Sequence, residues 1–316
     1  MNWIFAHGDG DGVSSAAIAL AVLKDARVFF SHPVGLLNDL KDNVKPGDYV
    51  IIMDIAVNER HALEVYKLFK VLSKKGNLVY IDHHPEPIEL KMKELPGTII
   101  HDEGACASEL TYRFFMDELD WEYNRLAIYG AISDYMADTK FIKEAISMWD
   151  VRHLYFEAGV LSQGLEGSRK LYDFKRHVVE HLSKNRLPSA LSELLVRALI
   201  ASINEDELIA YIRNNVKTYG NIAYIINPPG SVARAATYAR SITKKTVGIA
   251  GHIKGDIIVM SIRTRTTHID LNKVLRIISK KLNIDGGGHK QAAGARVPVK
   301  KFDEFLRLFS NAIKDH

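Results

Sequence analysis

Short apolar runs alternate with helical segments in the first half of the chain, and this alternation limits the fold more than any other feature. The runs that predict strands cover residues 3–6, 27–31, 49–55, 78–81 and 98–100. Between them, residues 14–24, 58–74 and 106–119 have the apolar spacing of helices. Such alternation predicts an α/β fold with a mostly parallel sheet. Ligands of these sheets bind beyond the carboxyl ends of the strands.

The rest of the chain changes pattern twice. Residues 122–217 are almost entirely helical in their spacing, with a break at 184–188, and a second α/β pattern begins at about residue 221. It contains predicted strands at 222–226, 246–251 and 257–263 and predicted helices at 231–241 and 271–282. We therefore expect a parallel-sheet domain over residues 1–185, a helical linker over 186–218 and a smaller α/β domain over 219–316.

Histidines and aspartates follow three of the predicted strands. The first strand leads into His7, Asp9 and Asp11, the third into Asp54, and the fourth into Asp82, His83 and His84. Neighbouring strand ends in one parallel sheet would gather these groups. Adjacent carboxylates repel one another unless cations neutralise them, and a mixed His and Asp set suits Mn²⁺, Fe²⁺ or Zn²⁺. The glycines at positions 8, 10 and 12 would let the backbone bend around the ions.

A fourth carboxylate is expected from Asp134 or from Asp138, which lies one helical turn further on. Two divalent ions held by such a set activate a water and clamp a phosphate, so the pattern predicts phosphoester hydrolysis. Each motif alone is also typical of a tight turn or a helix cap, and their joint occurrence at successive strand ends is what favours a metal site. A zinc-peptidase pattern at His177, Glu180 and His181 has no evident third ligand and is not favoured.

Charge is divided unevenly along the chain. Residues 1–150 hold 15 Lys and Arg against 24 Asp and Glu, a net charge of −9, whereas residues 151–316 hold 27 against 14, a net charge of +13. An acidic half suits cations and a basic half suits a polyanion such as nucleic acid. A solvated surface with uneven charge is the ordinary alternative.

Composition excludes two further classes of protein. No apolar run among the 316 residues approaches the about 18 that cross a membrane, and the single cysteine, Cys106, excludes an internal disulfide. The apolar stretch at 18–23 is too short for a span and follows aspartates rather than basic residues, so no signal peptide is expected. We expect a cytoplasmic protein with no membrane association.

Together, these motifs resemble those of the DHH phosphoesterase superfamily. The matching residues are H-x-D-x-D-G at 7–12, the isolated Asp54, Asp82-His83-His84 and Asp134. Gly286-Gly287-Gly288-His289, followed by Ala292-Ala293-Gly294, resembles the DHHA1 domain of that family. The superfamily contains RecJ-type exonucleases, nanoRNases, phosphatases of 3′-phosphoadenosine 5′-phosphate and cyclic dinucleotide phosphodiesterases.

The resemblance implies a role for each matching residue. His7 and Asp9 would bind one metal ion; Asp11, His83 and Asp134 would bind the other; Asp54 would bridge the two. His84 would face the phosphate or leaving group, with Asp82 supporting it as part of the catalytic set. Mn²⁺ is the expected ion, with Mg²⁺ as the alternative. In the second domain, the N–H groups of Gly286, Gly287 and Gly288, with His289 and Arg263, would grip a phosphate.

A catalytic domain joined to a phosphate-gripping domain predicts cleavage from a strand end. We expect an exonuclease on single-stranded DNA or short RNA that releases nucleoside 5′-monophosphates in DNA repair, replication or oligonucleotide turnover. The segment 149–181 interleaves aromatic and basic side chains that suit strand binding, although aromatics at helical spacing also suit a core. A small-molecule phosphoesterase and a scaffold within a helicase or replisome assembly are the alternatives.

Overall fold

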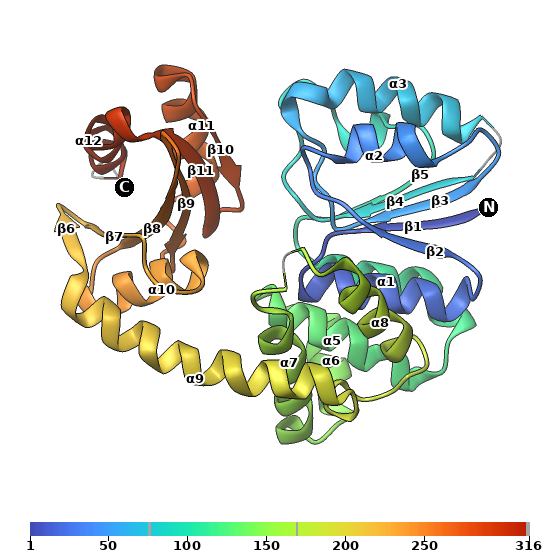
Figure 1. Ribbon diagram of the computed structural model, residues 1–316. Helices are drawn as coiled ribbons and strands as arrows, with labels where there is room; N and C mark the ends of the chain where they lie inside the picture. Colours follow the sequence, from blue (N-terminus) through green and yellow to red (C-terminus); the bar gives the residue numbers. More distant parts are fainter. Residues whose placement is uncertain (75–76, 169, 314–316) are drawn as a thin grey trace. The chain divides into compact units, whose positions relative to one another are not determined.

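The computed structural model describes residues 1–74, 77–168 and 170–313 (Figure 1). The chain divides into two compact units, which we call unit 1 (Met1–Ala201) and unit 2 (Ser202–His316). Helix α9 (Ser192–Asn215) runs through the boundary between them. This helix lies within the residues 186–218 that the sequence predicts as a helical linker.

Unit 1 is built on a parallel sheet. Among the described residues it has five strands in the order β2-β1-β3-β4-β5. Their bounds are Asn2–Ala6 for β1, Arg27–Phe30 for β2, Tyr49–Met53 for β3, Leu78–Asp82 for β4 and Thr98–His101 for β5. The central strands β1, β3 and β4 are apolar and almost fully buried, as strands covered on both faces must be. The parallel sheet predicted from the sequence is therefore confirmed.

Helices cover both faces of this sheet (Figure 1). On one face lie α2 (Leu36–Asn43), which the apolar pattern does not predict, and α3 (Ala62–Ser73). On the other face, α1 (Gly10–Val22) is packed by α4, α5 and α8, and its small residues are buried nearly all round. The remaining bounds are Ala107–Phe115 for α4, Asn124–Ser133 for α5, Lys140–Ser147 for α6, Val151–Leu165 for α7 and Tyr172–Leu182 for α8. Each face of the sheet thus has its own apolar core.

Unit 2 is a second α/β unit with a mixed sheet. Among the described residues its strand order is β10-β11-β9-β8-β7-β6. The strands are Lys217–Tyr219 for β6, Ile222–Ile226 for β7, Val247–Lys254 for β8, Ile257–Thr264 for β9, Asp285–Gly288 for β10 and Ala292–Pro298 for β11. The helices are Val232–Thr243 for α10, Leu271–Leu282 for α11 and Phe302–Ala312 for α12. The three glycines at 286–288 belong to edge strand β10, paired antiparallel with β11.

Within the described parts of the chain, no helix is both long and apolar enough to cross a membrane.

Candidate metal centre

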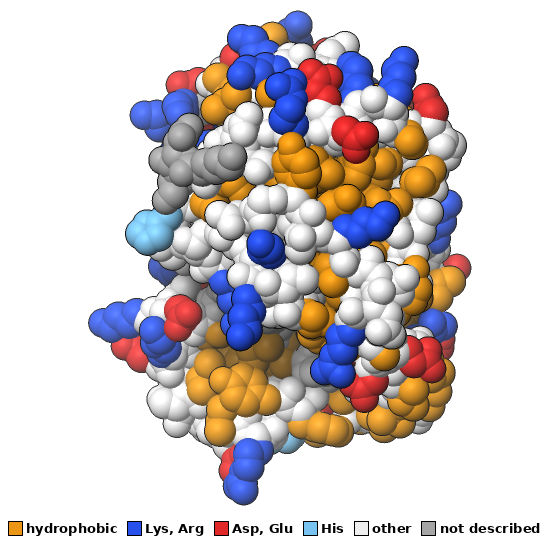
Figure 2. Space-filling view, turned by 90° about the vertical axis from the view of Figure 1, so that its left-hand side faces the viewer, with side chains coloured by type: hydrophobic (Ala, Val, Ile, Leu, Met, Phe, Trp, Pro, Cys, Tyr) orange, Lys and Arg blue, Asp and Glu red, His pale blue; other side chains and the backbone are white. Residues whose placement is uncertain are grey.

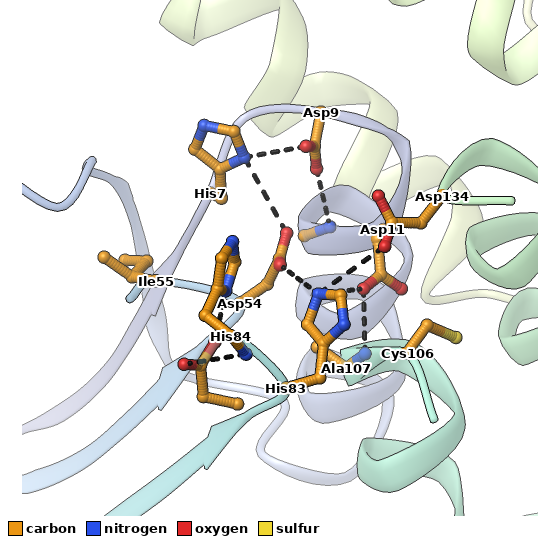
Figure 3. A network of polar contacts seen from close by, with 12 residues as sticks. His7, Asp9, Asp11, Asp54, Ile55, His83, His84, Cys106, Ala107 and Asp134 are labelled. Carbon is orange, nitrogen blue, oxygen red and sulfur yellow. Dashed lines mark hydrogen bonds and ion pairs between the residues drawn. The ribbon is translucent and has the colours of Figure 1, made fainter. Parts of the chain in front are cut away.

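The carboxyl ends of β1, β3 and β4 place the predicted polar groups at one edge of the sheet of unit 1. Ala6 pairs with Met53, and Met53 pairs with Ile81, so the residues that follow these strands lie side by side. Asp54 follows β3 with φ of 58°, a left-handed conformation that aspartate tolerates better than most residues. This conformation ends the strand two residues before the sequence predicts and turns the carboxylate into the cluster shown in Figure 3.

The carboxylate of Asp54 lies between two histidines. Its Oδ2 is 3.8 Å from Nδ1 of His7, and its Oδ1 is 3.3 Å from Nε2 of His83. The side chain is only 3% exposed, and Oδ2 accepts no hydrogen bond from the described residues. Burial raises the pKa of Asp54 well above its usual range, and the neighbouring carboxylates of Asp9 and Asp11 raise it further. A bound cation would offset both the desolvation of the Asp54 carboxylate and its repulsion by the neighbouring carboxylates.

Two groups of side chains on either side of Asp54 have the composition of metal sites. His7, Asp9 and Asp54 form one, and Asp11, His83 and Asp134 form the other; within each, one ligand atom per residue lies within 4.8 Å of the others. Nε2 of His83 is 3.8 Å from Oδ2 of Asp11 and 3.6 Å from Oδ2 of Asp134. Burial lowers the pKa of His83, which favours the neutral imidazole that metal binding requires. The donor set therefore fits two divalent cations.

Asp134 and Asp138 have different surroundings. Asp134 ends α5 and reaches the cluster, whereas the side chain of Asp138 is 99% exposed and pairs with Lys143 at 3.4 Å. The structure thus brings Asp134 to the other candidate ligands and leaves Asp138 outside them.

Asp11 has contacts that sequence reasoning missed. Its Oδ2 accepts a hydrogen bond from the N–H of Ala107 at 2.8 Å, and its Oδ1 accepts one from the N–H of Ser108 at 2.9 Å. The first N–H groups of a helix lack partners within the helix, so Asp11 caps α4 from a distant part of the chain. The residue types at 107 and 108 could not predict this contact, because only the backbone N–H groups of these residues take part.

The glycines of the first motif make room for protein atoms. A Cβ on Gly12 would lie 2.2 Å from the carbonyl oxygen of His7, and one on Gly10 would lie 2.3 Å from Oγ of Ser133. A Cβ on Gly8 would lie 2.6 Å from Nζ of Lys175, a buried lysine on α8. Close packing of the loop against neighbouring protein atoms therefore requires glycine at these three positions, and the bending of the backbone around ions stays a prediction.

His84 is held by Asp82. Nδ1 of His84 lies 2.8 Å from Oδ1 of Asp82, and the hydroxyl of Tyr80 donates to Oδ2 of Asp82 at 3.0 Å. Nε2 of His101 donates to the carbonyl oxygen of His84 at 2.7 Å. Tyr80 and His101 were not predicted from the sequence, since a buried strand tyrosine and a strand-end histidine are common in any core. The network fixes the His84 ring while leaving its Nε2 outside the pair with Asp82.

In unit 2, the predicted phosphate-gripping residues meet at one end of the sheet. Arg263 on β9 pairs with Ala292 on β11, and the N–H of His289 donates to the carbonyl oxygen of Ala292 at 2.8 Å from the opposite side. The Gly288 N–H donates to Oδ1 of Asn272 at 3.2 Å, and Gly286 and Gly287 lie on the same edge strand. Arg263 and His289 therefore flank one residue of β11.

Two family models match the chain in succession. The model of the DHH family N-terminal domain matches residues 2–139, and the model of the DHHA1 domain matches residues 196–315. None of the curated proteins matches the sequence.

Solved structures share the fold over almost the whole chain. RecJ from Thermus thermophilus in complex with Mn²⁺ has a TM-score of 0.70 at 15% identity, covering 99% of this chain and 52% of that one. The pGpG-specific phosphodiesterase PggH from Vibrio cholerae has a TM-score of 0.61 at 13% identity, covering 100% and 99%. CDC45 from Entamoeba histolytica has a TM-score of 0.52 at 8% identity, covering 98% and 95%. At these identities the likeness shows the fold, and the chain spans about half the length of that RecJ.

The two matching models, the parallel sheet and the His and Asp cluster at its carboxyl edge lead to the same assignment. The chain belongs to the DHH family of phosphoesterases and carries a DHHA1 domain as its second part.

Proposed function

We propose that this phosphoesterase is a two-metal exonuclease that shortens single-stranded DNA or RNA from an end and releases nucleoside 5′-monophosphates. The observation that carries the proposal is the buried carboxylate of Asp54 between two His and Asp groups. Mn²⁺ is the proposed ion, with Mg²⁺ as the alternative. DNA repair or oligonucleotide turnover, with a helicase or replisome protein as partner, is the proposed setting.

Each residue of the centre has a distinct task in this proposal. His7 and Asp9 would hold one cation, Asp11, His83 and Asp134 would hold the second, and Asp54 would contribute to both. When bound, the cations would supply Lewis acidity and neutralise the phosphate charge. Asp82 orients His84 through Nδ1, so that Nε2 can donate a proton or hydrogen bond to the phosphate or leaving oxygen.

The substrate class is supported by the charge of unit 2. Residues 202–316 hold 19 Lys and Arg against 9 Asp and Glu, which favours a polyanion. Figure 2 shows that, on one face of the molecule, Lys and Arg side chains are spread out instead of forming one patch. We therefore assign the phosphate grip to Arg263 and His289, which flank Ala292 at one end of the sheet. The guanidinium of Arg263, which donates from Nη1 to the carbonyl oxygens of Ile262 and Ala293, offers further N–H donors for a phosphate.

The first experiment is product analysis over time. End-labelled single-stranded DNA and RNA of different lengths are incubated with Mn²⁺ and the native protein or Asp54→Asn. A ladder of single-nucleotide steps that disappears in Asp54→Asn is the expected result. Efficient cutting of a circular strand would contradict cleavage from an end. Conversion of dinucleotides alone would move the function to a small-molecule phosphoesterase.

Two alternatives remain as proposals. The phosphodiesterase PggH is matched over 99% of its length, which suits a dinucleotide substrate. The second alternative is a scaffold within a helicase or replisome assembly. The intact set of His and Asp side chains at the centre argues against a scaffold without activity, since a non-catalytic relative has no need to retain them.

A further inference from the structure

An open groove follows the edge strand β2 of unit 1. A cavity of about 900 Å³ lies between β2, the end of α1 and α8, and a second of about 260 Å³ lies at the carboxyl end of β2. Phe29 and Arg176 line both, so the two form one continuous depression, which we call the β2 groove. The side chains on which the argument rests are Lys24, Arg27, Phe29, Tyr172, Arg176 and Lys184.

The charge of the β2 groove is opposite to that of the unit around it. Residues 1–201 hold 23 Lys and Arg against 29 Asp and Glu, a net charge of −6. Four cationic side chains nevertheless line the groove, and one of them, Arg176, is paired with Asp173 at 2.5 Å. The acidic lining among the described residues consists of Glu180 and Asp39. Asp39 already accepts a hydrogen bond from Oγ of Ser31. This local reversal of charge suits an anionic occupant.

Aromatic side chains lie among these cations. Phe29 and Tyr172 line the groove: Tyr172 is 42% exposed, and Phe29 is half-buried with its ring centre 5.2 Å from that of Phe5. The guanidinium of Arg27 lies 5.8 Å from the ring centre of Trp3, and the hydroxyl of Tyr123 donates to the carbonyl oxygen of Ser183 at 2.9 Å. Exposed aromatic faces interleaved with cations are the combination that binds single-stranded nucleic acid, because bases stack while phosphates pair.

The β2 groove ends beside the metal centre. Strand β2 is parallel to β1, with Phe30 paired to Ala6, so His32 in the groove lies level with the loop that begins at His7. Lys175 joins the two places, because its Nζ lies 5.9 Å from the ring centre of Phe30 and packs against Gly8 of that loop. From Arg27 to Phe30 the strand covers about 10 Å. A chain lying in the groove would therefore lead directly to the catalytic edge of the sheet.

We propose that the β2 groove binds the single strand along its course to the metal centre, with phosphates on its cations and bases against Phe29 and Tyr172. This inference rests on the proposed function, and it adds a binding surface that belongs to unit 1 alone. An edge strand can also accept a peptide or a second copy of the chain. The alternation of cations with aromatic side chains favours nucleic acid over both, because pairing along a strand edge uses backbone groups and needs neither phosphate-binding cations nor stacking rings.

The test reverses two groove charges and compares long with short substrates. Lys24→Glu with Lys184→Glu changes two exposed side chains at the groove wall. Lys67→Glu with Lys70→Glu is the matched control, because it makes the same change of charge on α3, on the opposite face of the sheet. The measurements are kcat/KM for a 12-nucleotide strand and for a dinucleotide, and equilibrium binding of an uncleavable phosphorothioate 12-mer at several salt concentrations.

For the groove variant we expect KM for the long strand to rise on the order of tenfold. The plot of log binding constant against log salt concentration should become less steep by about 1.4, because each lost phosphate contact with a single strand removes about 0.7 from the slope. The rate on the dinucleotide and the behaviour of the control should stay close to native. Tyr172→Ala should weaken binding of the long strand, whereas Tyr172→Phe, which keeps the aromatic ring, should bind it as tightly as the native protein. Equal behaviour of the groove and control variants would overturn the proposal, as would an equal loss on the dinucleotide.

Failure of the groove and failure of the exonuclease are separable. If the native protein hydrolyses long strands but the groove variant binds them normally, the groove proposal alone falls. If the native protein cuts only dinucleotides, the exonuclease proposal is wrong. Binding of the phosphorothioate strand to the native and groove variants still tests whether the β2 groove binds a single strand. A change of oligomeric state in the groove variant, with strand binding intact, would assign the surface to a second copy instead.

Discussion

The carboxylate of Asp82 and the imidazole of His84 form a fixed pair, with Oδ1 2.8 Å from Nδ1. Asp82 is almost completely buried, and its other oxygen, Oδ2, accepts a hydrogen bond from the hydroxyl of Tyr80. A carboxylate held in this way selects the tautomer of its histidine and stabilises the charged ring.

Asp82→Asn should lower kcat by about 100-fold, because an amide no longer stabilises the charged ring or fixes its tautomer. Bound metal, measured by elemental analysis, should remain near native, since Asp82 belongs neither to the group of His7, Asp9 and Asp54 nor to that of Asp11, His83 and Asp134. Tyr80→Phe is the milder companion and should reduce kcat by less. Loss of metal in Asp82→Asn would show that the residue is a ligand.

The metal-free protein should lose stability as pH rises from about 6.5 to about 9. Burial alone would lower the pKa of His84, but the charge of Asp82 and the hydrogen bond to it raise that pKa to about 9. A raised folded-state pKa stabilises the protein fully below the unfolded value of 6.5, and this stabilisation, about 3 kcal/mol, disappears as pH rises through 9. Thermal unfolding in chelator checks it, and His84→Asn should flatten the decline. An unchanged decline in that variant would contradict the assignment.

Asp54→Asn should stabilise the metal-free protein while reducing the stabilisation by Mn²⁺. Its carboxyl is buried among other carboxylates, so an amide removes repulsion and desolvation cost. The same change removes the oxygen charge that faces both metal groups. Melting temperatures with chelator and with Mn²⁺ measure the two effects separately. A native-sized shift with Mn²⁺ would mean that Asp54 does not bind the ions.

Gly130→Ala should destabilise the protein by about 1–3 kcal/mol. Its Cβ would lie 2.1 Å from Oγ of Ser108 and 2.6 Å from Oδ1 of Asp11, where the first turn of α4 meets a candidate ligand. Gly159→Ala, inside α7, is the matched control, because no neighbouring atom lies within 4 Å of its Cβ. The control should gain about 0.5–1 kcal/mol from helix propensity. Similar unfolding free energies for the two variants would refute the packing argument.

Tyr135→Gly should stabilise the protein by up to about 1 kcal/mol. Tyr135 has φ of 59° just after α5, a left-handed position that glycine prefers, and the Met136 N–H bonds back to the carbonyl of Ala131. Its side chain is 87% exposed, so little packing is lost. Tyr135→Ala, which retains a Cβ, should gain less in urea unfolding. A destabilised glycine variant would reveal that the exposed ring has a structural role.

The sequence predicts the parallel sheet because its central strands are continuous apolar runs whose ends carry the polar motifs. It does not predict α2, whose eight residues are mostly polar, nor the strand formed by Gly286, Gly287 and Gly288. Glycine has no strand preference of its own, and pairing with β11 decides that conformation. The confirmed part is thus the part encoded by local periodicity.

In the candidate centre, too, the sequence predicts some residues and misses contacts that depend on the tertiary structure. His7, Asp9, Asp54 and His83 could be named because side chains with metal-binding chemistry follow strands that must be neighbours. Asp138 could not be separated from Asp134, since both follow the same helix and only the turn at Tyr135 directs them apart. The N–H groups of Ala107 and Ser108 could not be foreseen, because a backbone contact leaves no trace in residue type.

Those two N–H groups bind the carboxylate of Asp11 and so give one side chain two separate roles. Replacing Asp11 would remove a candidate ligand and uncap α4 at the same time, so inactivity of such a variant would not separate chemistry from folding. Capping of α4 would therefore favour keeping aspartate at position 11 even if the protein lost its catalytic activity. An inactive descendant of this protein would therefore be expected to keep Asp11 longer than Asp9, whose side chain is half exposed.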